Sequence, residues 1–415
     1  MKKWQPQKPN STLIGDHQVP QLGDHLMGKK IALLLTGGIA AMTAPMIARQ
    51  LRRYGAQVTA YVSEEGLKYV TRDALAWSTN NSVVDKLTAR AEHLSDSQPY
   101  DIYLLAPATY NTINKVRHGI ADTLITTTMA SAIGWLEQKQ TQIVVCPTMH
   151  GSMHNSILQE SLEHLLKLGF LFIPPRDEYG KHNIPSAEDL VAQLIALTSA
   201  SPLKGKKILV TGGPTPVEID SVRRITNIFT GQLGYLMSRE LFYKGVDVTF
   251  IQGSKGLQTP LYLNTHKVST YDHYKKEVLA CLDQNSFDCA IFSAAVADYK
   301  PVETIKGKVP SGGALKNITL LPTEKVIDLV RDKFPGLPLI SFKYEENLSH
   351  EELMEIAKKR LDRGHFAIVA NRGEEFAIHN EQVAYLVSRE GTVEKIQGKS
   401  LIAQKIVNFL EKQLI

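Results

Sequence analysis

Two stretches of the sequence combine threonine and glycine in a pattern that could hold an anion. Thr36-Gly37-Gly38 follows the apolar run 31–35, and Thr211-Gly212-Gly213 follows the apolar run 208–210. A helical pattern begins directly after the first stretch, and at Gly231, after a polar loop, in the second. A strand, a glycine turn and a helix start together let backbone N–H groups face a phosphate. The repeated pattern predicts two nucleotide-type domains in one chain.

Composition bounds the class of protein. With 415 residues the chain is too long for one ordinary core. The net charge of +5 could attract phosphate-bearing metabolites, but it forms no basic block, so we expect no nucleic-acid partner. No apolar run approaches the ~18 residues of a membrane span, and the polar N-terminus lacks a signal-peptide core. Three cysteines without ligand or disulfide spacing fit a reducing compartment, and we expect a cytoplasmic enzyme.

Apolar runs alternate with helical periodicity in both halves, which predicts parallel sheets covered on both faces. In the first half we expect strands at 30–36, 57–62, 101–105, 143–146 and 170–173, and helices at 43–54 and 187–197. In the second half we expect strands at 208–210, 246–251, 289–292, 339–342 and 366–369, helices at 231–241, 271–282, 324–332, 350–363 and 401–414, and a hairpin-like pair around 389–392. The predicted fold class is α/β, with two doubly wound parallel-sheet domains. We assign residues 1–28 to a flexible tail, 29–198 to the first domain, 199–206 to a linker and 207–415 to the second domain.

Candidate ligand contacts of the first half share one sheet edge. Open parallel sheets bind ligands beyond the carboxyl ends of their strands. Residues 36–41, Ser63, 106–112 and 126–128 are predicted at strand ends or in the loops after them. A glycine pair alone is ordinary turn chemistry, but here every element falls on the same edge. Neither half contains a complete G-x-G-x-x-G, which disfavours an NAD-dependent dehydrogenase.

His93 stands eight residues before Asp101, and Gly119-Ile120-Ala121-Asp122 comes after the candidate contacts. With these motifs, residues 29–191 resemble the flavin-dependent cysteine decarboxylases, which include phosphopantothenoylcysteine and peptidyl-cysteine decarboxylases. The resemblance implies a flavodoxin-like fold, FMN as cofactor, a trimer whose neighbours complete each site, and His93 as the catalytic histidine. It implies FMN contacts at Gly37, Gly38, Ile39, Ser63, Ala106, Pro107, Ala108, Thr109, Asn111 and Thr127.

The first half departs from this family at two places. His150 stands where the family has an asparagine that binds the substrate carboxylate, and we expect it to take that catalytic role. Residues 178–186 contain no cysteine, although the coenzyme A branch carries there a clamp cysteine that supplies a proton. Three alternatives are open: His182 or Lys181 delivers the proton, the product stays at the oxidised enethiol level, or the domain does not decarboxylate.

Residues 204–415 resemble the phosphopantothenate–cysteine ligases, the partner domain in bifunctional coenzyme A proteins. The motifs include 211–215, 219–223, 225–227, 294–299 and 369–371. The resemblance implies a Rossmann-like domain that forms dimers and uses CTP and Mg²⁺ to activate the pantothenate carboxylate. It implies catalytic roles for Asn227, Arg223 and Lys306 and a metal contact at Asp298. It implies nucleotide contacts at Gly212, Gly213, Thr215, Gly231, Ala295, Asp298, Lys306, Phe342, Lys343 and Asn371.

This half also departs from its family. Gln232 and Thr304 stand at positions where the family has lysines, and residues 376–379 replace a Phe-Gly-Ser-Asp motif. Losing two cations weakens the stabilisation of a triphosphate unless Lys308 or Lys300 substitutes.

The leading hypothesis is a bifunctional enzyme of coenzyme A biosynthesis. One half would ligate 4'-phosphopantothenate to cysteine with CTP, and the other would decarboxylate the product to 4'-phosphopantetheine with FMN. The alternatives are a diverged paralogue whose flavin domain acts on another cysteine-containing or pterin-like substrate, and a non-decarboxylating FMN-binding scaffold.

Overall fold

The computed structural model describes residues 14–253, 257–310, 312, 317–375, 381–391 and 393–414, apart from the side chains of residues 95–97. The predicted motif 376–379, the Lys/Gly-rich residues 313–316 and Thr392 of the predicted hairpin lie outside these ranges. The chain divides into two compact units, Met1–Thr198 and Ser199–Ile415. No helix of the described ranges is long and apolar enough to cross a bilayer.

The first domain is built on a five-stranded parallel sheet with the order β2-β1-β3-β4-β6. Its strands are β1 (Lys30–Leu35), β2 (Gln57–Val62), β3 (Ile102–Ala108), β4 (Gln142–Pro147) and β6 (Leu171–Phe172). The inner strands are continuous apolar runs buried on both faces, as parallel strands require. This strand order is flavodoxin-like. From β1 the chain first adds β2 on one side and then β3, β4 and β6 on the other, so the topological switch point lies between β1 and β3.

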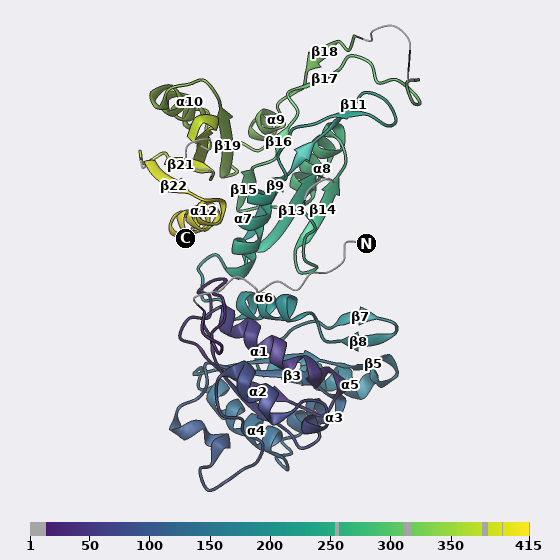
Figure 1. Ribbon diagram of the computed structural model, residues 1–415, viewed down its shortest axis with the longest axis vertical. Helices are drawn as coiled ribbons and strands as arrows, with labels where there is room; N and C mark the ends of the chain where they lie inside the picture. The colour runs from purple at the N-terminus through teal and green to yellow at the C-terminus, as the bar shows by residue number, and fades with distance from the viewer. Residues whose placement is uncertain are drawn as a thin grey trace, which may run out of the picture. The chain divides into compact units, whose positions relative to one another are not determined.

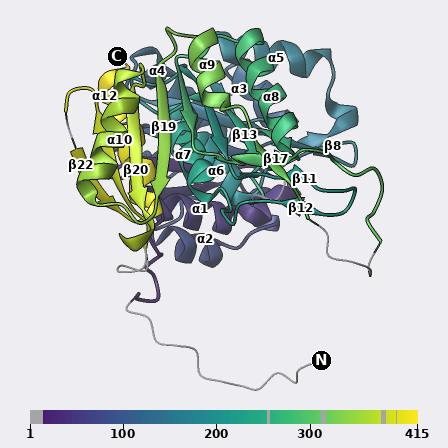
Figure 2. The ribbon, with the colours of Figure 1, turned by 90° about the horizontal axis from the view of Figure 1, so that it is seen from above.

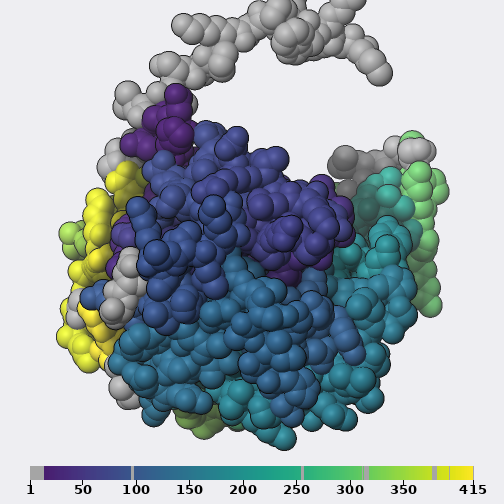
Figure 3. All heavy atoms as spheres, turned by 90° about the horizontal axis from the view of Figure 1, so that it is seen from below, coloured from purple at the N-terminus to yellow at the C-terminus, as the bar shows by residue number. Residues whose placement is uncertain are grey.

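Helices cover both faces of this sheet (Figure 1). α3 (Tyr110–Arg117), α4 (Leu124–Glu137) and α5 (Ser156–Lys167) share one core with alternate side chains of β1, β3 and β4. α1 (Ala44–Arg53) packs against α2 (Arg72–Thr79) and α6 (Ala187–Thr198). The domain also contains η1 (Ile39–Thr43), η2 (Gly66–Lys68), η3 (Glu92–Ser97) and η4 (Gly151–Met153). Figure 3 shows its atoms, in purple to teal, closely packed on the face in view.

Part of the predicted tail packs on the first domain. The N–H groups of Leu22 and Leu26 donate to the carbonyls of Arg53 and Tyr54, and the Leu26 side chain is buried. Gly55 ends α1 with φ +92°, and a Cβ there would lie 2.8 Å from the Cα of Met27. The glycine that ends the helix therefore also leaves room for this segment to pack against it. Residues 22–28 are not a loose tail.

A small antiparallel sheet projects from the first domain. β5 (Met149–His150) pairs with β8 (Lys181–Asn183), and β8 pairs with β7 (Arg176–Glu178). We call β7, β8 and their turn the arm.

The second domain is built on an eight-stranded sheet with the order β14-β13-β9-β15-β19-β20-β21-β22. β9 (Lys207–Gly212), β13 (Asp247–Gly253), β14 (Asn264–Val268), β15 (Cys289–Phe292), β19 (Leu339–Glu345) and β20 (Ala367–Arg372) are parallel. β21 (Val383–Ser388) and β22 (Val393–Gln397) are antiparallel. The predicted α/β class with two parallel-sheet domains is confirmed.

Helices cover this sheet too. α7 (Gln232–Tyr243) and α12 (Lys399–Gln413) share one core, and α8 (Tyr271–Gln284) and α9 (Val326–Lys333) share another. α10 (His350–Asp362) packs on β20, and α12 packs on β22 (Figure 2). Short pairs extend beyond the end of the sheet in Figure 1: β10 (Pro214–Thr215) with β16 (Ala295–Val296), β11 (Val217–Glu218) with β12 (Arg224–Ile225), and β17 (Tyr299–Pro301) with β18 (Leu320–Pro322).

Candidate active sites

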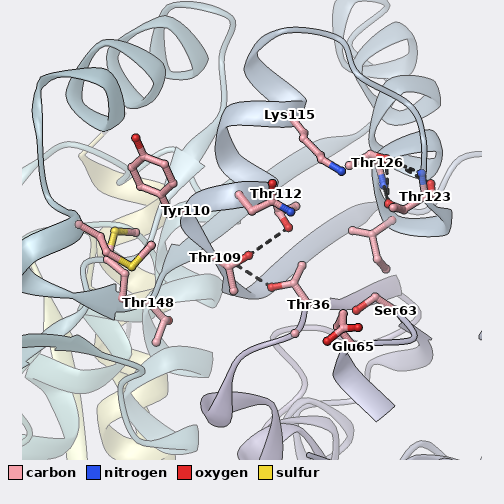
Figure 4. A pocket seen from close by; sticks show the side chains of 15 residues that line it. Thr36, Ser63, Glu65, Thr109, Tyr110, Thr112, Lys115, Thr123, Thr126 and Thr148 are labelled. Carbon is pink, nitrogen blue, oxygen red and sulfur yellow. Dashed lines mark hydrogen bonds between the residues drawn. The ribbon is translucent and has the colours of Figure 1, made fainter. Parts of the chain in front are cut away.

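A cavity of about 390 Å³ opens at the carboxyl ends of β1 to β4 in the first domain (Figure 4). Hydroxyl groups form most of its polar lining, and one side is apolar. The lining residues are Thr36, Gly37, Ser63, Glu65, Thr109, Tyr110, Asn111, Thr112, Lys115, Thr123, Ile125, Thr126, Thr148, Met149 and Met153. Gly37, Ser63, Thr109 and Asn111 of the predicted FMN contacts are among them.

Thr36 joins two strands beneath this cavity. It is buried at the end of β1, where its hydroxyl donates to the carbonyl of Pro107 (2.7 Å) and accepts from the N–H of Thr109 (3.3 Å). Figure 4 marks the second bond. Ala106, Pro107 and Ala108, which we predicted at a strand end or in the loop after it, form the end of β3 and are buried, and the Ala106–Pro107 peptide is cis. These three residues are not among those that line the cavity.

Two helices begin at the cavity. α3 begins after Thr109, which makes no side-chain cap bond, so the first N–H groups of α3 remain available to a ligand. α4 begins after Thr123, whose hydroxyl accepts from the N–H of Thr126, while the Thr126 hydroxyl accepts from the N–H of Thr123. The cavity therefore lies between two positive helix ends, an arrangement that favours an anion.

The capping box of α4 corrects one prediction. Residues 126–128 lie in the first turns of a helix and not in a loop, because the Thr123 cap starts the helix two residues earlier. Thr126 lines the cavity, whereas the hydroxyl of Thr127 donates to the carbonyl of Ala121 (3.1 Å).

The two glycines of the first opening differ in their surroundings. A Cβ on Gly37 would lie 2.3 Å from the Cβ of Glu65, so the turn after β2 closes directly on Gly37. A Cβ on Gly38 would meet only the Thr109 methyl, at 3.3 Å. Ile39, the next predicted contact, is 68% exposed and does not line the cavity.

His93 lies in η3, which packs against α4. Its Nδ1 is buried and has no hydrogen-bond partner among the described residues. The histidine does not line the cavity of its own chain.

In the second domain, the glycine turn after β9 meets the start of α7. Gly231 caps α7 with φ +77°, and a Cβ there would lie 2.6 Å from both N and Cα of Gly213. A Cβ on Gly234 would lie 3.0 Å from the Cα of Gly212. Only glycine allows this backbone approach, which brings the N–H groups at the start of α7 to the turn.

The loops after β9 and β15 bind each other. Ala295 N–H donates to the Gly213 carbonyl (2.9 Å), and Ala297 N–H donates to the Thr215 hydroxyl (3.0 Å). The side-chain amide of Asn227 donates to the Ala295 carbonyl (3.0 Å). Four residues predicted from three motifs, Gly213, Thr215, Asn227 and Ala295, therefore lie together.

Arg223 is positioned by a buried carboxylate that we did not predict. Asp220 is 1% exposed and accepts from the N–H groups of Val222 (2.8 Å), Arg223 (2.6 Å) and Val309 (3.1 Å), and from the Arg223 guanidinium (2.6 Å). Burial alone raises the pKa of Asp220, but these four donors together hold it well below its usual range. Asp220 thus ties the loop of Arg223 to the loop of Lys306, an exposed residue.

The remaining predicted contacts lie along the same sheet edge or near it. Phe342 and Lys343 are in β19 and Asn371, which is buried, is in β20. The ring of Phe229 packs edge-on against Tyr344, with centroids 5.6 Å apart, so the loop before α7 reaches β19. Lys343 pairs with Glu345, and Asp298 pairs with Lys325.

Comparison with known proteins agrees with this division. The family model described as Flavoprotein matches residues 21–199, and the model described as DNA/pantothenate metabolism flavoprotein C-terminal domain matches residues 203–414. A coenzyme A biosynthesis bifunctional protein CoaBC from Thermococcus kodakarensis is 35% identical over 397 residues, which covers 94% of this chain and 96% of the relative. The chain belongs to this family.

Other members and structures are also similar. The CoaBC protein of Methanocaldococcus jannaschii is 32% identical over 390 residues, covering 93% of this chain and 94% of the relative. A crystal structure of a DNA/pantothenate metabolism flavoprotein from Streptococcus pneumoniae is 26% identical, with a TM-score of 0.45 over 50% of this chain and 99% of that chain. Membership confirms the predicted enzyme class, a ligase and a decarboxylase of coenzyme A biosynthesis on one chain, and does not favour a different function for the flavoprotein half.

Asp177 and His182 of the arm and His154, which follows η4, form a chain of contacts. His182 Nδ1 contacts the carboxylate of Asp177, and His182 Nε2 lies 2.9 Å from His154 Nδ1. His182 stands opposite Met149, a cavity residue, and His154 follows Met153, another. The sequence did not point to Asp177 or His154; the hairpin register sets Asp177 opposite His182, and the pairing of β5 with β8 brings the segment that carries His154 alongside.

His150 lies beside the Asp177–His182–His154 contacts but outside the cavity. It is exposed, and its Nδ1 contacts the hydroxyl of Ser152 (2.8 Å) and accepts from the Ser152 N–H (3.2 Å). Its neighbour Met149 lines the cavity, and because successive side chains of a strand point to opposite faces, His150 points away from the lining.

A lysine remote in sequence contacts Gln232, one of the two positions at which we expect a family lysine to be missing. Lys399 Nζ, at the start of α12, is 3.0 Å from the Oε1 of Gln232, the residue at the position of a family lysine. α7 and α12 pack against each other, which brings the two side chains together. Neither Lys308 nor Lys300, which we considered from the sequence, was this residue.

Proposed function

We propose that the second domain joins 4'-phosphopantothenate to cysteine with CTP and that the first domain decarboxylates the product to 4'-phosphopantetheine with FMN. The observation that carries the proposal is the cavity between the starts of α3 and α4 in a flavoprotein domain, on the same chain as the Gly213–Gly231 junction of a ligase domain. Each site offers backbone donors to a phosphate, as FMN and CTP both require.

The first cavity fits FMN chemically. The uncapped N–H groups of α3 and the hydroxyls of Ser63, Thr109 and Thr123 would hold the phosphate, and Met149 and Met153 would contact the ring system. Bound FMN would supply the oxidation of the substrate thiol that makes loss of CO₂ easy. Gly37 is needed because its missing side chain leaves room for the turn at Glu65.

His93 would act on the substrate in the cavity of a neighbouring copy. Two observations support a shared site: its buried Nδ1 has no partner among the described residues, and it does not line the cavity of its own chain. Ile39, Met42 and Met46 form an exposed apolar stripe beside the first opening, which supports assembly of this domain into the trimer that the family resemblance implies. Dimeric ligase domains and a cytoplasmic location remain part of the proposal, the latter supported by three buried free cysteines.

We assign proton delivery to His182 rather than to Lys181. Asp177 would orient the His182 ring through Nδ1, and His182 Nε2 would donate its proton to the substrate after exchanging its contact with His154 for one with the substrate. Lys181 is exposed and has no partner like Asp177 to orient it among the contacts of the described residues. His150, next to this chain, would bind the substrate carboxylate when protonated.

In the ligase domain, Asn227 and Arg223 would hold the carboxylate while it is activated, and Lys306, on the adjoining loop, would offset phosphate charge. Gly212, Gly213, Thr215, Gly231 and Ala295 would cradle the triphosphate, and Phe342, Lys343 and Asn371 would complete the nucleotide site. Asp298 would bind Mg²⁺ only after Lys325 releases it, and Lys343 would likewise exchange Glu345 for phosphate. Lys399 would replace one lost lysine.

The test uses the purified full-length chain with FMN, CTP, Mg²⁺, 4'-phosphopantothenate and cysteine, followed by mass spectrometry. We expect 4'-phosphopantetheine. Asn227→Ala should abolish the conjugate, whereas His93→Asn should let the conjugate accumulate without decarboxylation. No conjugate from the wild-type protein would overturn the ligase proposal.

The arm is tested separately with the conjugate as substrate. His182→Asn should slow 4'-phosphopantetheine formation roughly 100-fold or more, and Lys181→Ala, on the neighbouring residue, should not. Equal rates for wild type and His182→Asn would eliminate His182 as the proton donor while leaving the decarboxylase itself intact.

A further inference from the structure

A cluster of three different ligand groups lies at the edge of the second domain, away from the motifs used above. His266 is in β14, the outermost strand of the sheet, and Glu277 and Cys281 are one turn apart on α8, which packs on β14. Because residues four apart share a helix face, Glu277 and Cys281 both point at His266.

The three ligand atoms form a compact triangle. His266 Nδ1 is 2.6 Å from Glu277 Oε1, Cys281 Sγ is 3.7 Å from the same oxygen, and Cys281 Sγ is 3.9 Å from His266 Nδ1. In a tetrahedral zinc site, with bonds of about 2.0–2.3 Å, such atoms lie roughly 3.3–3.6 Å apart. The sulfur contacts are longer than this and the His–Glu contact is shorter, so a shift of well under 1 Å in each atom converts the triangle into three ligands.

The three side chains differ in exposure, as in a metal site that is open to solvent on one side. Cys281 is 6% exposed, while the side chains of His266 and Glu277 are 35% and 28% exposed. A cation seated here would touch solvent on one side, where water would supply the fourth ligand. Sulfur, imidazole and carboxylate together suit Zn²⁺ and its neighbours in the periodic table, and not Mg²⁺, which prefers oxygen ligands alone.

We propose that His266, Glu277 and Cys281 bind one Zn²⁺ ion, or a divalent cation of the same class, that fastens the edge strand β14 to α8. On binding, His266 gives up the proton on Nδ1 and keeps one on Nε2, so that the His266–Glu277 hydrogen bond is replaced by one bond from each residue to the metal, and the Cys281 thiol loses its proton to solvent and binds as thiolate. Burial and the nearby Glu277 raise the pKa of Cys281 to about 11, which makes this proton costly to remove and the affinity moderate. The site is independent of the proposed catalytic Mg²⁺ at Asp298.

The experiment titrates the full-length protein, freed of metal with a chelator, with Co²⁺ as a spectroscopic probe. We expect one equivalent of Co²⁺ to produce thiolate-to-metal charge-transfer absorption and tetrahedral visible bands, and Zn²⁺ to displace it. Cys281→Ser should remove the charge-transfer absorption, and Cys289→Ser, whose thiol is buried in β15 and contacts the Ala290 carbonyl, should keep it. Because His266 is partly exposed, His266→Gln should fold and bind Co²⁺ at least tenfold more weakly.

A thermal measurement keeps the proposal testable if Cys281→Ser is unstable. Zn²⁺ should raise the melting temperature of the second domain in wild type, and should not do so in Glu277→Gln. Charge-transfer absorption that survives in Cys281→Ser, or the same Zn²⁺-induced rise in wild type and Glu277→Gln, would show binding elsewhere and overturn the proposal.

Discussion

The two Thr-Gly-Gly openings of this molecule use the same first contact and then diverge. Thr36 accepts the N–H of Thr109, and Thr211 accepts the N–H of Ala294, both at 3.3 Å. In each domain the donor follows the neighbouring strand, β3 beside β1 and β15 beside β9. A buried threonine hydroxyl therefore joins the ends of two central strands in both domains, where a valine of the same shape would leave the N–H group unsatisfied.

The two openings diverge in the segment of chain after the glycines. In the first domain η1 begins within one residue of Gly38, and the turn after β2 closes on Gly37. In the second domain residues 214–230 leave the sheet, form β10, β11 and β12, and return at Gly231 to rest on Gly213. The first opening thus lines a cavity with hydroxyls, whereas the second supports loops that carry Arg223 and Asn227, for which we propose contacts to the substrate. The same strand and glycine turn can support two different sites because the two domains differ in the segment that follows the turn. A sheet tolerates such connecting segments over a wide range of lengths.

The largest expected effect tests the return of the chain at Gly231. Gly231→Ala should lower ligase turnover roughly 100-fold, because a Cβ 2.6 Å from the Gly213 backbone displaces the turn by a large fraction of an ångström. Gly205→Ala is the matched control, since Gly205 has φ +82° but no atom within 4 Å of its added Cβ. Steady-state kinetics of both variants would separate the clash from the strain of a positive φ, and equal losses would remove the backbone approach from the explanation.

The next largest effect is a loss of stability in acid, which we expect in the second domain because of His365. Burial, together with Arg360 and Arg331, lowers the pKa of His365 in the second domain to about 4. The unfolded chain binds a proton near pH 6.5 and the folded chain does not, so stability is complete above pH 6.5 and falls as the pH drops toward 4, by about 2 kcal/mol at pH 5.

Hydrogen exchange resolved by domain measures this loss. His365→Asn keeps a hydrogen-bonding group for Ser341 without a titrating ring, and should flatten this part of the pH dependence of the second domain. An unchanged slope in the variant would mean that another group is responsible.

Gly37 and Gly38 test the closed opening. Gly37→Ala should weaken FMN binding by about 1–3 kcal/mol, because its Cβ would overlap the Cβ of Glu65. Gly38→Ala should have little effect, since Gly38 has an extended backbone (φ −143°) and its nearest contact would be at 3.3 Å. Flavin fluorescence titration gives both affinities, and a larger loss in Gly38→Ala would reverse the assignment of the close contact.

The smallest effect tests the shared threonine contact itself. Thr36→Val and Thr211→Val should each reduce the stability of their own domain by about 1–2 kcal/mol, with Thr211 at the upper end because the buried Tyr274 hydroxyl also loses its acceptor. Tryptophan fluorescence reports the first domain alone, because Trp4, Trp77 and Trp135 all lie in the first half of the sequence. Domain-resolved hydrogen exchange reports the second, and a loss confined to one domain would end the analogy between the openings.

Much of the fold could be predicted because its signals are local. Hydrophobic runs identified the strands β2 and β15 to the residue, and Gly55 marked the end of α1. Short or polar elements were missed, such as the edge strand β14 and the helix α4, whose threonine-rich start resembles a loop until Thr123 and Thr126 cap each other. The domain boundaries and the roles of the predicted site residues stay predictions.

The sequence by itself determined the two openings, the alternation of strands and helices, and the motifs that carry the family resemblance, because each depends on residues close together in the chain. Only the tertiary structure decided which remote groups stand at the positions where motifs are broken. Asp177 meets His182 through the register of β7 with β8, His154 contacts it from the segment after β5, and Lys399 reaches Gln232 through the packing of α12 on α7. Such pairs leave no local pattern in the sequence, because an ion pair or a hydrogen bond requires proximity in space and does not depend on separation along the chain.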